Sequence, residues 1–103
     1  MDYVALLTYQ PSASAAERDA ALARRAAWQY PDGVRFIAEY WPLSDGPQVV
    51  SIFSTDDPAA LMQLEFEWND VFTVDIHPAV AADKGLEIGA EVFSRLTRLQ
   101  QPS

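Results

Sequence analysis

The sequence predicts a single α+β domain in which a four-stranded antiparallel sheet carries two helices on one face. The first observation is the order of strand-like and helix-like segments, β-α-β-β-α-β followed by a third helix. The second is that the strand-like runs are apolar on both faces, as in Val49-Val50-Ser51-Ile52-Phe53. The third is size, because 103 residues, half of them hydrophobic, provide for one domain (residues 1–103) with one core.

The first three elements are marked by a helix cap and a turn. A strand is expected over residues 3–9. Ser14 and Glu17 match a capping box, in which each side chain accepts a hydrogen bond from the backbone amide of the other residue. They predict a helix that runs to about Trp28. Pro31-Asp32-Gly33 is a turn signal, and a second strand is expected over residues 34–41.

The next two elements follow a polar loop. Asp45-Gly46 within that loop indicates a hairpin connection to a third strand over residues 48–54. Asp57, with Pro58 directly after it, predicts the start of a second helix, since Asp is a favoured cap and Pro a favoured first helical residue. The packing stripe expected for this helix is Leu61, Leu64 and Trp68.

The last two elements are a strand over residues 72–78 and a helix from about Asp83 to Leu99. The strand alternates apolar and polar residues with period two. The helix has acidic residues early and basic residues late, which suits its dipole. Its apolar stripe consists of Leu86, Val92, Phe93, Leu96 and Leu99.

This order of elements predicts a ferredoxin-like topology. Right-handed crossovers make the two strands of each β-α-β unit parallel and put the helix of each unit on one face. Two such units joined by a hairpin give a split β-α-β sheet with spatial order 4-1-3-2. Both crossover helices then cover the same face, and the other face is left open.

In each strand, the less apolar set of alternate residues is expected on the open face. On the fourth strand, Thr73, Asp75 and His77 are expected on the open face. On the second strand, Arg35, Ile37, Glu39 and Trp41 are expected there. On the first strand, Val4 and Leu6 are expected inside, which places Tyr3, Ala5, Leu7 and Tyr9 outside. On the third strand, both sets are apolar, and Val49, Ser51 and Phe53 are placed on the open face.

Composition excludes several classes of function. The net charge is −8, and no Lys or Arg occurs between Arg35 and Lys84, so the clustered cations that nucleic-acid binding needs are missing. The absence of cysteine excludes disulfides and thiolate metal sites. No apolar run is long enough to cross a membrane, and the N-terminus does not resemble a signal peptide, so a cytoplasmic protein is expected.

The candidate site lies on the expected open face. His77 is the only histidine, and an ordinary imidazole titrates near neutral pH, so it is the candidate base, with Asp75 placed to orient it. The ligand pocket is expected to be formed by Tyr3, Tyr9, Glu39, Trp41 and Phe53. One histidine and one nearby carboxylate are too few for a closed metal site, and no cofactor is expected. No Ser-His-Asp, P-loop or dinucleotide signature is present.

Over about residues 1–80 the chain resembles a family of small proteins known as domain of unknown function 3303. The resemblance depends on the opening strand, on Phe36-Ile37-Ala38-Glu39-Tyr40, on the helix start Asp56-Asp57-Pro58-Ala59-Ala60-Leu61, and on Trp68-Asn69-Asp70 leading to Pro78-Ala79-Val80. It implies the dimeric α/β-barrel superfamily, in which two ferredoxin-like sheets pack their open faces together. It implies no activity and no catalytic residues.

Three functions are compatible with these residues. The first is a homodimeric α/β barrel that binds a small, partly apolar molecule, or nothing, between its sheets. The second is a cofactor-independent oxygenase or isomerase with His77 as base. The third is a haem or metal carrier that uses His77. The partners expected are a second copy of the chain and a small-molecule ligand, but neither a nucleic acid nor a membrane.

Overall fold

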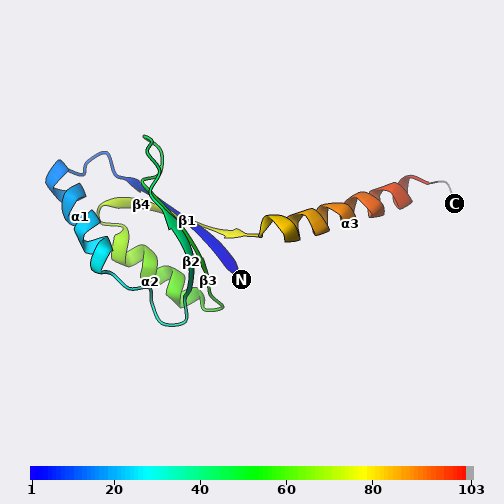
Figure 1. Ribbon diagram of the computed structural model, residues 1–103, viewed down its shortest axis with the longest axis horizontal. Helices are drawn as coiled ribbons and strands as arrows, with labels where there is room; N and C mark the ends of the chain where they lie inside the picture. Colours follow the sequence, from blue (N-terminus) through cyan, green and yellow to red (C-terminus); the bar gives the residue numbers. More distant parts are fainter. Residues whose placement is uncertain (102–103) are drawn as a thin grey trace.

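The computed structural model describes residues 1–101 and consists of a sheet, two helices packed on it, and a third helix that stands apart (Figure 1). The elements in chain order are β1 (Asp2–Tyr9), α1 (Ala15–Ala27), β2 (Arg35–Tyr40), β3 (Val49–Ser54), α2 (Pro58–Trp68), β4 (Phe72–Ala79) and α3 (Ala82–Gln100). Every predicted element is present, with ends that differ from the expected ones by at most one residue.

The sheet has the predicted topology. Its strand order is β2-β3-β1-β4, which is 4-1-3-2 in the opposite direction, and all three strand pairs are antiparallel. Helices α1 and α2 lie together on one side of the sheet, as Figure 1 shows. The fold is therefore a ferredoxin-like α+β sheet with an additional C-terminal helix.

Both predicted helix caps are confirmed. Ser14 Oγ accepts a hydrogen bond from the Glu17 amide at 3.1 Å, and Glu17 Oε1 accepts one from the Ser14 amide at 3.1 Å, which completes the capping box of α1. The Asp57 carboxylate accepts a bond from the Ala59 amide at 3.0 Å, and Pro58 occupies the first turn of α2.

The core lies between the sheet and helices α1 and α2. Its largest fully buried side chains are Trp68, Phe53, Phe72, Leu7, Leu64 and Val49. The face assignment for β4 is confirmed, since Phe72 is buried and Val74 and Ile76 pack against this core.

The face assignments for β1 and β3 were wrong. Tyr3, Ala5, Leu7 and Tyr9 face the helices, as do Val49, Ser51 and Phe53, so the open face takes the alternate residues of both strands. Ala5 pairs with Ser51 in the register, and these small residues lie between the larger pairs Tyr3–Phe53 and Leu7–Val49. This arrangement lets the helices lie close to the centre of the sheet while the aromatic and aliphatic groups fill the space around it.

A β-bulge corrects the assignment for β2. Phe36 pairs with Phe53 and Ala38 pairs with Ile52, so Ile37 is an extra residue without a partner on β3. The alternation changes phase at this point. Glu39 consequently pairs with Ser51 and lies on the helix face, whereas it was expected on the open face.

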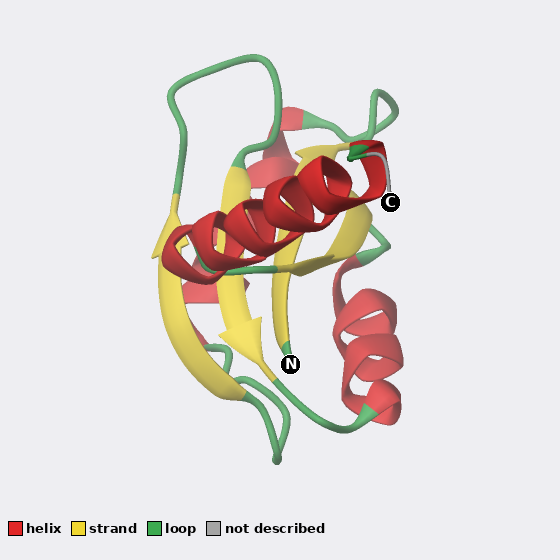
Figure 2. Cartoon of the chain, turned by 90° about the vertical axis from the view of Figure 1, so that its right-hand side faces the viewer, coloured by secondary structure: helices red, strands yellow, loops and turns green. Residues whose placement is uncertain are grey.

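Helix α3 leaves the sheet on the side opposite α1 and α2 (Figures 1 and 2). None of its residues is buried. The Cα radius of gyration is 18.3 Å, whereas a compact domain of this length has about 13 Å. Within residues 1–101 no helix combines the length and the apolar character needed to span a membrane.

Candidate functional site

The open face of the sheet carries an apolar centre bordered by polar groups on β4. The strand register aligns His77, Val4, Ile52 and Ala38 in one row across the sheet. The next row consists of Asp75, Leu6, Val50 and Tyr40. The four aliphatic residues of the central strands are only partly buried, because no element within residues 1–101 covers this side.

A shallow hollow of about 240 Å³ lies at one end of this face. Val4 and Ile52 form its floor, the bulged residue Ile37 borders it, and Asp2 is the only charged residue in its lining. The remaining lining residues are Ala79, Val80 and Ala81, where the chain passes from β4 into α3. The bulge therefore brings an isoleucine to the rim of the hollow.

His77 and Asp75 lie on the open face, where they were expected. Both side chains are exposed on the edge strand β4, opposite Val4 and Leu6 of β1. Within residues 1–101 no hydrogen bond joins the two side chains, and His77 does not line the hollow. In the same residues, no group of three or more His, Asp or Glu side chains could hold a metal ion.

The five residues expected to form the ligand pocket do not lie on the open face as a group. Tyr3 stacks on Phe53 with ring centroids 5.9 Å apart, and Tyr9 stacks on Phe72 at 5.0 Å, all on the helix side. Glu39 and Trp41 do meet, since the Trp41 indole N–H donates to Glu39 Oε2 at 2.9 Å. Glu39, however, points to the helix side because of the bulge.

The helix side holds a buried ion pair that was not among the sites predicted from the sequence. Arg25 donates to Glu39 through Nη2 (2.5 Å) and Nε (3.3 Å), and its side chain is 3% exposed. The Tyr30 hydroxyl donates to Glu39 Oε1 at 2.9 Å and shares a hydrogen bond with the Ser51 hydroxyl. Glu39 thus accepts from three side chains of different segments and links α1 to the edge of the sheet.

Aromatic rings enclose the Arg25 guanidinium. Its carbon lies 4.4 Å from the Trp28 ring centroid, 4.8 Å from that of Trp68 and 5.6 Å from that of Tyr30. Such contacts favour a cation and also cover it from water. A sequence signal for this position exists, because Ala21, Arg25 and Trp28 follow the i, i+4, i+7 spacing of a helix face that packs on a core.

The electrostatics of this cluster keep it in one protonation state at neutral pH. Burial raises the pKa of Glu39, but the hydrogen bonds from Arg25 and Trp41 outweigh it and hold the pKa below its usual value of 4.5. Burial raises the pKa of Tyr30 to about 12. The pKa values of Glu39 and Tyr30 are both moved away from neutral pH, so the arrangement is suited to holding the fold rather than to acid–base catalysis.

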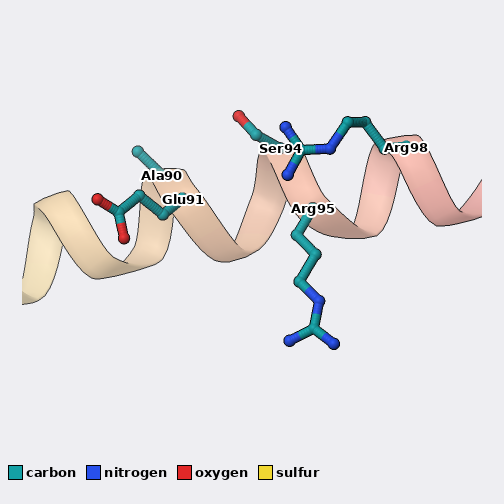
Figure 3. Close-up of a pocket in the computed structure, with 5 residues that line it drawn as sticks. All are labelled: Ala90, Glu91, Ser94, Arg95 and Arg98. Carbon is teal, nitrogen blue, oxygen red and sulfur yellow. The ribbon is translucent and has the colours of Figure 1, made fainter.

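A larger hollow of about 510 Å³ lies beside α3, but only that helix forms its wall. Figure 3 shows its five lining residues, Ala90, Glu91, Ser94, Arg95 and Arg98, all on one stretch of helix. Arg98 bends back toward Ser94, while Arg95 points to the other side. With no element facing it, this surface encloses nothing and is not a binding site of the single chain.

The fold and these surfaces define a ferredoxin-like α+β domain with an uncovered apolar sheet face. The chain belongs to the family described as domain of unknown function 3303, whose family model matches residues 1–93. The match extends beyond the sheet and includes the first part of α3. No match was found among curated proteins or among solved structures.

Proposed function

We propose that the protein is a homodimer in which a second copy covers the open face of each sheet, and that the covered space binds a small, partly apolar molecule. The observation that carries this proposal is the composition of the open face. Val4, Leu6, Val50 and Ile52 form a continuous apolar centre that α1 and α2 do not cover. These side chains are already partly buried, so a covering subunit removes only their remaining exposed apolar surface, which stabilises the dimer by roughly 25 cal/mol for each Å².

The hollow at the end of this face supports the ligand part of the proposal. Ligand pockets have about 300–1,000 Å³, and a hollow of about 240 Å³ closed by a second subunit approaches that range. Its aliphatic lining suits a small apolar group. Asp75 and His77, on the neighbouring strand, are available to the polar end of such a molecule.

Light scattering during size-exclusion chromatography at micromolar concentration tests the dimer. The wild-type chain should have twice the mass of the monomer. Val50→Lys places a charge in the apolar centre and should give a monomer. Met62→Lys is the matched control, because Met62 is exposed on α2, away from the open face, and its variant should remain a dimer. A monomeric wild-type chain would refute the proposal.

Fluorescence of the neutral apolar dye N-phenyl-1-naphthylamine tests the binding site. The wild-type protein should enhance the fluorescence of the dye with saturation. Ile37→Trp fills the rim of the hollow and should abolish this enhancement. Leu43→Trp adds the same indole at a fully exposed loop position and should leave it unchanged. Equal enhancement by both variants would show that the dye binds elsewhere.

A further inference from the structure

We infer that α3 is an exchanged arm, which packs its apolar face on the open sheet face of the second copy. Helix α3 has 19 residues and buries none of them in its own chain. Figure 1 shows it extending away from the domain, and Figure 2 shows it standing in front of the strands. A helix of this length without packing partners has little to hold it folded in water. Its stability therefore calls for a surface outside its own domain.

The helix has one strongly apolar side. At 100° per residue, its six large apolar residues fall on that side: Leu86, Ile88, Val92, Phe93, Leu96 and Leu99. All six are exposed, with Leu86 at 76% and Phe93 at 73%. Charged residues occupy the other side. This pattern is typical of a helix that covers an apolar surface.

Two glycines lie along the middle of the apolar side. Gly85 and Gly89 are four residues apart, and a Cβ atom at either position would have no neighbour within 4 Å. Glycine inside a helix lowers its stability relative to alanine, and nothing in the chain itself requires glycine at these positions. Without side chains there, the backbone of α3 can approach a sheet surface closely.

The link between β4 and α3 directs the helix away from its own sheet. Only Val80 and Ala81 connect the two elements, and Ala81 is extended, with φ −57° and ψ 143°. The link contains no glycine and no residue with positive φ that would reverse the chain. The open face that α3 can reach in this conformation is therefore that of another copy.

Length and area match such an exchange. Nineteen helical residues span about 28 Å, and strands of six to eight residues span roughly 20–27 Å. In a two-fold dimer the contact forms twice. Six apolar side chains of α3, at roughly 60–120 Å² each, together with the smaller area still exposed on the four open-face residues, would bury on the order of 1,500 Å² over both copies. A stable dimer buries about 1,200–2,000 Å².

Charge is complementary as well. Residues 1–81 hold twelve acidic and four basic residues, whereas residues 82–103 hold three of each. The last two turns of α3 carry Arg95 and Arg98 and no acid. The arm thus brings its basic end toward an acidic body, and this charge complementarity makes the second copy a suitable partner.

Engineered cysteines test the arm, which depends on the proposed dimer, because the natural chain has no cysteine. Ile52→Cys, at the centre of the open face, is combined in turn with Gly89→Cys, Val92→Cys or Leu96→Cys on the apolar side of α3. Ile52→Cys with Ser94→Cys, on the polar side, is the matched control, and Ile52→Cys alone is the baseline. A disulfide requires Cα atoms about 4.4–6.8 Å apart. Each full-length variant is oxidised and analysed by non-reducing electrophoresis and by mass spectrometry of linked peptides.

The expected result is a linked dimer joining residue 52 to an apolar-side cysteine, above the baseline and absent with Ser94→Cys. A disulfide within one chain would show that α3 folds back on its own sheet and would overturn the inference. Equal linking with Ser94→Cys would overturn it too. A light-scattering dimer without linkage to α3 would refute the arm but preserve the homodimer. A light-scattering monomer would refute both.

Discussion

The residue that most constrains the helix side of the sheet is Arg25. Its guanidinium combines an ion pair to Glu39 with contacts to three aromatic rings, and its side chain is almost completely covered. A buried charge is tolerated only while its partners are present, since removing one partner leaves the other charge without compensation. The cluster therefore fixes α1 to the β2 edge, because Arg25 Nε and Nη2 both donate to the Glu39 carboxylate.

Arg25→Ala should lower the free energy of unfolding by about 3 kcal/mol, because it leaves Glu39 half-buried without its cation and opens a space between the rings. Urea unfolding followed by circular dichroism, at one fixed protein concentration, measures this change. Arg24→Ala is the matched control. Arg24 is partly exposed, makes two hydrogen bonds to Asp70 and lies over the Trp68 ring, so its loss should cost less than the loss of Arg25, about 1 kcal/mol. Equal costs for both variants would contradict the importance assigned to the buried pair.

Glu39 should also give the stability an acid dependence. Its pKa is lowered in the folded state, so its stabilising contribution is complete above the usual value of 4.5 and is lost as the pH falls through the folded pKa. Wild-type protein should therefore lose more stability between about pH 6 and about pH 3 than Glu39→Gln does. Urea midpoints at several pH values give the comparison. If the urea midpoints of the two proteins fell by the same amount between these pH values, the Glu39 carboxylate would not contribute to the pH dependence of stability.

At the scale of elements, the caps and turns could be predicted from the sequence, but the faces of β1 and β3 could not. Ser14, Glu17, Asp57 and Pro58 act through local hydrogen bonds and backbone angles, which a short segment encodes. The two central strands are apolar on both sides, so alternation alone did not distinguish their faces. The cluster around Arg25 was missed for a related reason, since the bulge at Ile37 reverses the phase before Glu39.

Deletion of Ile37 tests the bulge. Because Ile37 is the residue without a partner on β3, its removal should leave a regular ladder and keep Glu39 on the helix face. We expect a folded protein that retains the Arg25 pair but has lost most of its enhancement of dye fluorescence. Circular dichroism and the dye titration measure both properties. Deletion of Ser51 is the control, since it shifts the phase of a regular strand and should unfold the protein. Unfolding of both variants would contradict this account of β2.

At the scale of the whole molecule, the chain exposes two apolar surfaces. The sheet lacks a cover on its open face, and α3 lacks a surface to cover. The amphipathic pattern of α3 could be predicted from the sequence, but its separation from the domain could not, because nothing local in the pattern tells which sheet a helix will meet. In a two-fold dimer, α3 of each copy covers the open sheet face of the other, so one kind of contact, formed twice, buries both surfaces.

The double substitution Gly85→Ala and Gly89→Ala tests whether α3 is free in solution or packed on a second copy. It should stabilise a free helix, but it should weaken the dimer if the helix is packed. On a free helix the two methyl groups meet nothing, and alanine should stabilise α3 by about 1 kcal/mol per position. Against the sheet of a second copy they should force the helix outward, so the dimer dissociation constant should rise by about tenfold or more, which corresponds to about 1.4 kcal/mol.

Sedimentation equilibrium over a range of concentrations measures the constant, and far-UV circular dichroism confirms that helix content has not fallen. Ser94→Ala, on the polar side, improves helix propensity without meeting the partner, and its dissociation constant should equal that of the wild type. A glycine double variant that is more stable and dimerises as tightly as the wild type would show that α3 packs on nothing.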